Sequence, residues 1–126
     1  MHKSQLAGLI IDCKDADLDQ AAAFWSAALG FKAISDPRSD DSKYRCLETP
    51  PDDLDIEVQK VDHPSRIHLD IESDDVEAEV ARLTQLGAKT IARVHSWVVM
   101  EAPTGQRFCV IKPCRANFER TANRWD

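Results

Sequence analysis

Two residues of the chain have side chains and positions that suit a divalent metal ion. Glu57 and His68 lie on the polar sides of two segments in which apolar and polar residues alternate. Alternate residues of a strand point to opposite faces of a sheet, so both side chains could point into one cavity. Carboxylate and imidazole ligands suit Zn²⁺, Ni²⁺, Fe²⁺ or Mn²⁺, and a metal with few protein ligands leaves positions for substrate oxygens. The alternative is a hydrated sheet face, where the same alternation arises without any metal.

Two carboxylates follow His68 on the same side of its segment. Asp70 and Glu72 continue the alternation toward the end of this predicted strand. A carboxylate there could orient the imidazole, contact a substrate or act as an acid or base. Asp70 is therefore a candidate substrate-binding residue, and the alternative is that both groups are surface carboxylates.

A repeated phrase predicts the two helices that accompany these strands. Asp17 begins one helical segment and Asp74 begins another, and the segments end at Gly30 and Gly87 at one constant offset. Aspartate before a helix caps its first amide groups, and glycine ends a helix in the left-handed conformation. The repeat predicts a fold built from two copies of one supersecondary unit.

The remaining periodicity predicts eight strands around the two helices. In chain order the predicted strands cover residues 6–12, 31–34, 43–47, 54–61, 66–72, 89–94, 97–101 and 107–112. Each half then has the order βαβββ, which indicates an α+β protein with a largely antiparallel sheet. We expect a single domain over residues 1–126, with module one at about 5–61, module two at about 65–113 and a tail at 114–126. A ferredoxin-like arrangement is the rival, and it leaves strands of each repeat unassigned.

Size and charge exclude several classes of protein. The chain has 126 residues, a net charge of −6 and a pI of about 5.1, and it lacks the clustered basic residues that nucleic acid requires. No apolar run is long enough for a membrane span, and the N-terminus lacks a signal peptide. The four cysteines show no C-x-x-C pair, so we expect reduced thiols and a cytoplasmic location.

Four phrases resemble the vicinal oxygen chelate superfamily, and in particular its glyoxalase-like and bleomycin-resistance-like members. The phrases lie at residues 24–31, 67–71, 82–88 and 102–108, in the order that the family shows. The resemblance implies the glyoxalase/bleomycin resistance/dioxygenase fold, in which two βαβββ modules form a curved, mostly antiparallel sheet around a cleft. It also implies a small-molecule ligand and a homodimer.

The family holds its metal at four strand positions, and these can be transferred to this sequence one at a time. The fourth-strand position falls on Glu57, the fifth-strand position on His68 and the eighth-strand position on Cys109. The first-strand position falls on Gly8 or Ile10, and neither of these can bind a metal. The resemblance thus implies a metal set of His68, Glu57 and Cys109, with a thiolate that suits zinc.

Two further residues are candidates for binding a substrate in the cleft that the resemblance implies. Asp12 shares the strand face of Gly8 and Ile10, although a role in a turn or cap is an alternative. Trp97 follows a predicted turn and could line the mouth of the cleft, or else pack in the core or an interface.

Three functions remain open at the level of the sequence. The first is a divalent-metal-dependent lyase or isomerase that acts on a small oxygenated metabolite, with Glu57 transferring the proton. The second is a metal-free protein of the bleomycin-resistance type that binds small molecules. The missing first-strand ligand and the net charge of −6 favour this second function, because an acidic protein attracts cationic ligands. The third is a structural or regulatory dimer without a small ligand.

Overall fold

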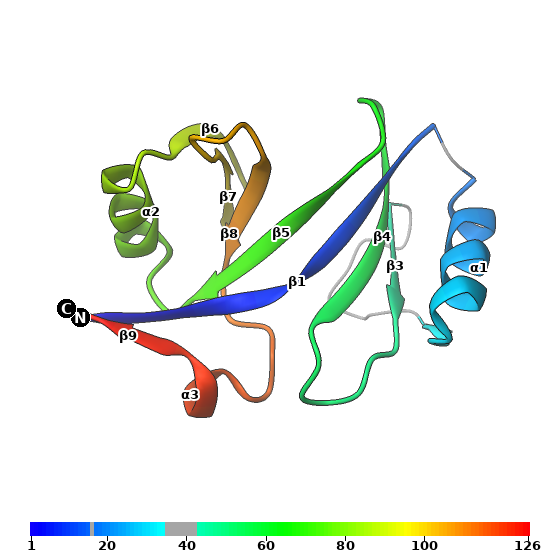
Figure 1. The fold of residues 1–126 in the computed structure, drawn as a ribbon, viewed down its shortest axis with the longest axis horizontal. Coiled ribbons are helices and arrows are strands. Elements are labelled where there is room, and N and C mark those ends of the chain that lie inside the picture. The colour runs from blue at the N-terminus through cyan, green and yellow to red at the C-terminus, as the bar shows by residue number, and fades with distance from the viewer. Residues whose placement is uncertain (16, 35–42) are drawn as a thin grey trace. The chain divides into compact units, whose positions relative to one another are not determined.

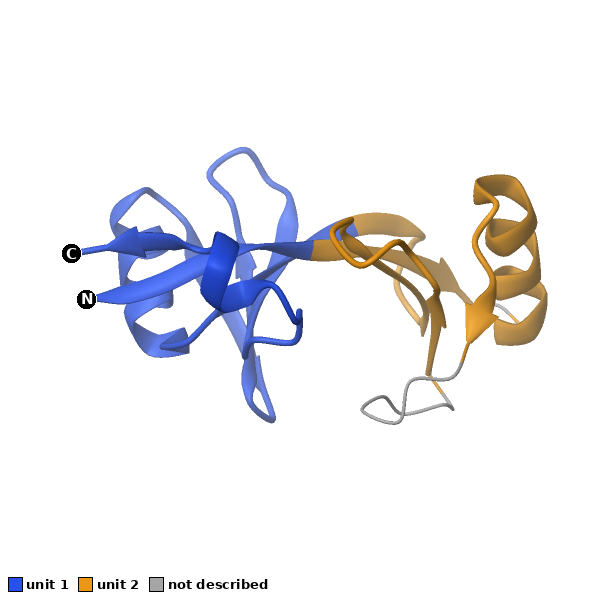
Figure 2. Cartoon of the chain, turned by 90° about the horizontal axis from the view of Figure 1, so that it is seen from below, with its two compact units in different colours: residues 1–7, 68–126 blue, residues 8–67 orange. Residues whose placement is uncertain are grey.

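The computed structural model describes residues 1–15, 17–34 and 43–126, and these residues form two compact units. Unit 1 contains residues 1–7 and 68–126, and unit 2 contains residues 8–67 (Figure 2). The first strand is shared, because its beginning belongs to unit 1 and its remainder to unit 2. Among the described residues, no helix combines the length and the apolar character that crossing a membrane requires.

The order of helices and strands confirms the predicted βαβββ–βαβββ pattern (Figure 1). Two short elements, α3 and β9, follow it in the tail and were not predicted from the sequence. The ferredoxin-like alternative is wrong, because three strands follow the helix in each half, and that arrangement accounts for only one of them. The elements are β1 (His2–Lys14), α1 (Leu18–Leu29), β2 (Ala33–Ile34), β3 (Tyr44–Leu47), β4 (Asp55–Val61), β5 (Arg66–Ser73), α2 (Val76–Gln85), β6 (Lys89–Val94), β7 (Trp97–Glu101), β8 (Arg107–Ile111), α3 (Phe118–Thr121) and β9 (Asn123–Trp125).

In unit 2 the strand order is β2-β3-β4-β1, and helix α1 packs against β3 and β4. Strands β1 and β4 are parallel, with Gly8 beside Asp55 and Ile10 beside Glu57. A Cβ atom at Gly8 would overlap the backbone carbonyl oxygen of Asp55. Glycine is therefore required at this position by the close approach of the two strands.

In unit 1 the strand order is β1-β5-β8-β7-β6, and β9 pairs with the beginning of β1. Strands β5 and β8 are parallel, whereas β6, β7 and β8 pair in antiparallel fashion. Helix α2 covers one face of β6, β7 and β8 (Figure 1). The core between helix and sheet consists of Val80, Ala88, Val98, Met100 and Val110. The opposite face of the same strands carries both polar and apolar side chains, among them Cys109 and Val99.

Helix capping agrees with the repeated phrase in part. The Asp17 side chain accepts hydrogen bonds from the first amides of α1, and Gly30 and Gly87 both have the expected positive φ. In the second copy Asp75, and not Asp74, caps the helix. Asp74 instead accepts a hydrogen bond of 2.8 Å from the backbone amide of Lys3.

A fully buried carboxylate, Glu79 on α2, joins both ends of the chain to unit 1. It accepts two hydrogen bonds from Arg82, of 2.8 and 2.9 Å, and lies 2.8 Å from the His2 ring nitrogen. The Arg82 guanidinium lies 3.8 Å from the centre of the Trp125 ring, whose indole N–H donates to Ser4. Burial raises the pKa of Glu79, but hydrogen bonds from Arg82, Ser4 and His2 outweigh it and lower this pKa to about 2.

A second buried carboxylate, Glu72 at the end of β5, holds the segment that follows β8. Its Oε1 accepts hydrogen bonds from the backbone amides of Cys114 and Arg115, of 2.7 and 3.0 Å. Its Oε2 accepts a hydrogen bond of 2.8 Å from the Gln5 side chain on β1. These contacts make the tail an integral part of unit 1.

We expect the Glu79→Gln variant to lose a pH-dependent part of the stability. The folded state lowers the pKa of Glu79 below its usual value of 4.5. The stabilisation is therefore complete above that pH and is lost as the pH falls toward 2. The difference in unfolding free energy between wild type and variant should shrink by about 1.4 kcal/mol per pH unit below pH 4.5. Urea unfolding of both proteins between pH 7 and pH 3 measures this difference.

The matched control is Glu77→Gln, because Glu77 lies on the same helix and pairs with Arg93 at the surface. This variant should show no such pH dependence, since exposed ion pairs contribute little. If the difference in unfolding free energy between wild type and Glu79→Gln stays constant down to pH 3, the lowered pKa of Glu79 is contradicted.

The Gly8→Ala variant should lose about 1–3 kcal/mol of unfolding free energy, because the added methyl group meets the Asp55 backbone. Gly105→Ala serves as a comparison, since a Cβ atom there meets no atom within 4 Å and only the positive φ is strained. Denaturant unfolding of both variants tests this, and a smaller loss at Gly8 than at Gly105 would contradict the close approach.

Candidate metal centre

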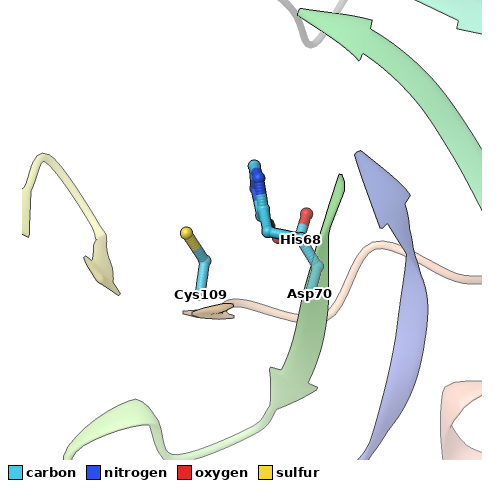
Figure 3. A group of neighbouring side chains, drawn as sticks. All are labelled: His68, Asp70 and Cys109. Atoms are coloured by element: carbon cyan, nitrogen blue, oxygen red, sulfur yellow. Dashed lines mark ion pairs between the residues drawn. The ribbon is translucent and has the colours of Figure 1, made fainter. Parts of the chain in front are cut away.

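The candidate site lies on the face of unit 1 that faces away from α2. Asp70 on β5 is the register partner of Cys109 on β8, and His68 precedes Asp70 by two residues on the same face. The three side chains converge from neighbouring strands (Figure 3). Their ligand atoms all lie within 4.8 Å of one another, and His68 Nε2 is 3.6 Å from an Asp70 carboxylate oxygen. Over the described ranges this is the one group of three such side chains.

The donor set of this cluster fits a divalent metal. Imidazole nitrogen, carboxylate oxygen and thiolate sulfur are all zinc ligands, with bonds of about 2.0–2.3 Å. Ligand atoms bonded to one zinc ion lie roughly 3–4 Å apart, so only small side-chain rotations separate the cluster from a coordinating arrangement. The His68 and Asp70 side chains are 12% and 17% exposed, so water reaches them only in part. Three protein ligands would leave a fourth position for a substrate oxygen.

The predicted ligand Glu57 lies on β4 in unit 2, so it belongs to a different unit from His68 and Cys109. Within unit 2 its carboxylate lies 3.4 Å from the Cys46 thiol, which donates a hydrogen bond across the β3–β4 pair. Its predicted roles as metal ligand and proton carrier stay predictions. The cluster of unit 1 contains Asp70 as its carboxylate, although the sequence pointed to Asp70 as a substrate-binding residue.

The first strand offers no ligand at the positions that the resemblance gives. Gly8 has no side chain, and Ile10 is an apolar residue that is buried at 4% exposure. Asp12 lies further along β1, also in unit 2, and its side chain is buried. Its carboxylate lies 3.7 Å from the His63 ring and 3.8 Å from Arg66 Nε, so the structure gives it an electrostatic role. Its predicted contact with a substrate stays a prediction.

Trp97 lies on the same face of unit 1 as the cluster. It precedes Val99 by two residues on β7, and Val99 is the register partner of Cys109. Its ring lies beside that of His95, with 5.4 Å between ring centres. Trp97 is half-buried, so part of its surface stays available on the face that carries the cluster.

The sequence did not predict that Asp70 belongs with Cys109. Alternation placed Asp70 on the polar face of its strand, and Cys109 was a candidate only through the resemblance. Alternation carries no information about which strands are neighbours. Only the parallel pairing of β5 with β8 brings these two residues together. The one feature of the sequence that could have indicated this pairing was the order β-α-β-β-β of the second module. In the structure, the last strand of that module lies beside its first strand.

Comparison with known proteins identifies the family. A family model described as a glyoxalase-like domain matches residues 8–111. The chain therefore belongs to the glyoxalase-like family, within the vicinal oxygen chelate superfamily. No curated protein sequence matches the chain.

Solved structures share the fold at low sequence identity. A methylmalonyl-CoA epimerase from Mycobacterium tuberculosis is 19% identical with a TM-score of 0.62, over 86% of this chain and 87% of that one. A hypothetical protein from Bacillus halodurans is 13% identical with a TM-score of 0.65, over 89% and 96% of the two chains. A Streptomyces coelicolor methylmalonyl-CoA epimerase in complex with 2-nitronate-propionyl-CoA is 14% identical with a TM-score of 0.57, over 86% and 98%. These likenesses show a common fold.

Zinc should bind the wild-type protein at one equivalent and raise its melting temperature, because a ligand that binds only the folded state stabilises it. We expect His68→Ala, Asp70→Ala and Cys109→Ala each to weaken binding at least about tenfold, since each removes one donor atom. Calorimetric titration with Zn²⁺ measures the affinity.

Two variants control for indirect effects on zinc binding. Cys114→Ala removes a thiol of the same unit that lies outside the cluster, and it should leave zinc binding unchanged. Glu57→Gln tests whether unit 1 alone holds the metal, and unchanged affinity would favour Asp70 as the carboxylate ligand. Equal affinities for wild type and Cys109→Ala would contradict the site.

Proposed function

We propose that this protein is a divalent-metal-dependent isomerase or lyase of the glyoxalase type that acts on a small oxygenated metabolite. One observation carries the proposal: His68, Asp70 and Cys109 bring nitrogen, oxygen and sulfur donors to one point of the fold. Membership in the glyoxalase-like family supports it, because metal-dependent rearrangements are common in that family. The fold alone does not define an activity, so the donor set is the stronger argument.

In this proposal His68, Asp70 and Cys109 hold the metal. A bound divalent ion supplies Lewis-acid polarisation of adjacent substrate oxygens, which makes a neighbouring C–H bond more acidic. The partial burial of His68 and Asp70 limits the access of water, which strengthens electrostatic interactions at the site. Glu57 is the proposed proton carrier on the strength of the family resemblance.

The proposal includes the partners that the resemblance implies. The ligand is a small molecule, the protein assembles as a homodimer, and it resides in the cytoplasm with reduced thiols. None of the cysteines in the described residues forms a disulfide bond, and a thiolate metal ligand has the same requirement. The epimerases among the solved structures favour the isomerase over the lyase, as an analogy of fold.

A metal-free binding protein of the bleomycin-resistance type is the second candidate. The first-strand positions Gly8 and Ile10 favour it, because they supply none of the donors that a four-position metal site needs. The net charge of −6 would attract a cationic ligand. This candidate predicts that zinc leaves the melting temperature unchanged while a cationic glycopeptide raises it.

Hydrogen–deuterium exchange at carbon tests the proposed activity. Zinc-, nickel- or manganese-loaded protein is incubated in D₂O with small 2-hydroxy and 2-oxo compounds, and NMR follows deuterium at the carbon beside the carbonyl. We expect exchange that depends on the metal and falls about 100-fold or more in His68→Ala, because polarisation of the substrate is lost.

His63→Ala is the matched control, since His63 is a histidine of unit 2 outside the cluster. It should retain the exchange activity of the wild type. The proposed enzymatic activity is rejected if, for every compound and metal, the wild type exchanges hydrogen no faster than His68→Ala does.

A further inference from the structure

The face of unit 1 that carries the metal cluster is organised in three rows across the strands. The middle row contains Asp70 and Cys109, followed by Val99 on β7. On one side of it lies an apolar row that includes Ile111 and Trp97. On the other side lies a charged row, whose residues are not ligands of the metal cluster.

The charged row begins beside the metal ligand His68. Leu69 and Phe108 form the first pair of the parallel register of β5 and β8, and His68 and Arg107 are the residues that directly precede this pair on the two strands. Neighbouring strands are about 4.8 Å apart, which is within the reach of an arginine side chain. Arg107 precedes Cys109 by two residues and therefore shares the face of the cluster.

Two cations and one anion occupy the rest of this row. Arg107 Nε donates a hydrogen bond of 3.1 Å to Glu101, its register partner on β7. Lys89 on β6 is the register partner of Glu101 on the other side. Glu101 thus lies between two positive groups, and the row carries a net charge of +1.

We propose that Arg107 binds the carboxylate of the ligand at the metal centre, so that the ligand is a small carboxylic acid. The proposal rests on the proposed function, because it requires a metal at His68, Asp70 and Cys109. A guanidinium has five N–H donors, and Glu101 receives only the one on Nε. The two terminal NH₂ groups match the two oxygens of a carboxylate.

Charge balance favours an anion over a neutral ligand at this place. The charges of Asp70 and of a Cys109 thiolate offset those of a divalent ion, so the loaded cluster has no net charge to attract an anion. Arg107 supplies a positive charge on the face of the cluster, two residues before Cys109, and 33% of its side chain is exposed. Glu101 fixes the guanidinium and does not block it.

The apolar row indicates that the end of the ligand opposite the carboxylate is apolar. Ile111 and Trp97 of this row and Val99 of the middle row are half-buried side chains on the same face. A ligand with its carboxylate at Arg107 and its oxygens at the cluster would place a hydrocarbon substituent over these residues. The rows together indicate a short carboxylic acid with an oxygen on the neighbouring carbon and an apolar group beyond it.

Cobalt-substituted protein provides a test that does not depend on turnover. The visible absorption of Co²⁺ bound to a thiolate reports metal binding, and its change reports a ligand that reaches the metal. Lactate is titrated as the carboxylate probe, and acetohydroxamic acid as a chelator that has adjacent oxygens and no carboxylate. We expect Arg107→Gln to weaken lactate binding at least about tenfold and to change acetohydroxamate binding less than about threefold.

Two variants complete the design. Arg107→Lys should recover part of the lactate affinity, because it keeps the charge and loses the paired donors. Arg93→Gln is the matched control, since Arg93 forms a comparable ion pair with Glu77 on the α2 side of the sheet. It should bind lactate as the wild type does.

The possible results separate this inference from the proposed function. A protein that gives no thiolate–cobalt absorption rejects the metal site, and the inference fails with it. Normal cobalt absorption with equal lactate affinity in Arg107→Gln and Arg93→Gln rejects the role of Arg107 alone. Absence of lactate binding to the wild type, or an equal loss of both probes in Arg107→Gln, also overturns it.

Discussion

The parallel register between β5 and β8 is the constraint on which the candidate site depends. It places Asp70 beside Cys109 on one face and Ile71 beside Val110 on the other. The second face packs against helix α2, where Val110 is fully buried. A slip of one residue would exchange the two faces, so the apolar core of unit 1 also fixes the positions of the metal-binding side chains. Packing and chemistry are thus set by the same pair of strands.

Buried carboxylates perform a separate task in unit 1. Glu72 and Glu79 are both fully buried. Glu72 accepts hydrogen bonds from Gln5 and from the backbone amide of Cys114, and Glu79 contacts His2 in addition to its hydrogen bonds from Arg82. A buried carboxylate is costly without such donors, so the contacts also explain why residues 1–7 and the tail belong to this unit. The carboxylates that could serve chemistry are the less buried ones, with Asp70 in this unit and Glu57 in the other.

Periodicity in the sequence predicted the elements and their faces well. The alternation around His68 and the caps at Asp17 and Gly30 are local features, and the structure confirms the strand and the helix that they define. Neighbour relations between strands are not local, which is why Asp70 was not assigned to a cluster with Cys109. The same limit applies to Glu79. Nothing local in the sequence shows that His2 contacts this carboxylate or that Trp125 packs on its partner Arg82.

The central claim is that one metal ion binds to a nitrogen, an oxygen and a sulfur donor of unit 1. X-ray absorption spectroscopy of the zinc-loaded protein tests it most directly, since sulfur and lighter donors give separate distances. The claim predicts one sulfur at about 2.3 Å and nitrogen or oxygen donors at about 2.0 Å, with the sulfur lost in Cys109→Ala. A zinc shell without sulfur in the wild type, or one unchanged by Cys109→Ala, would contradict it.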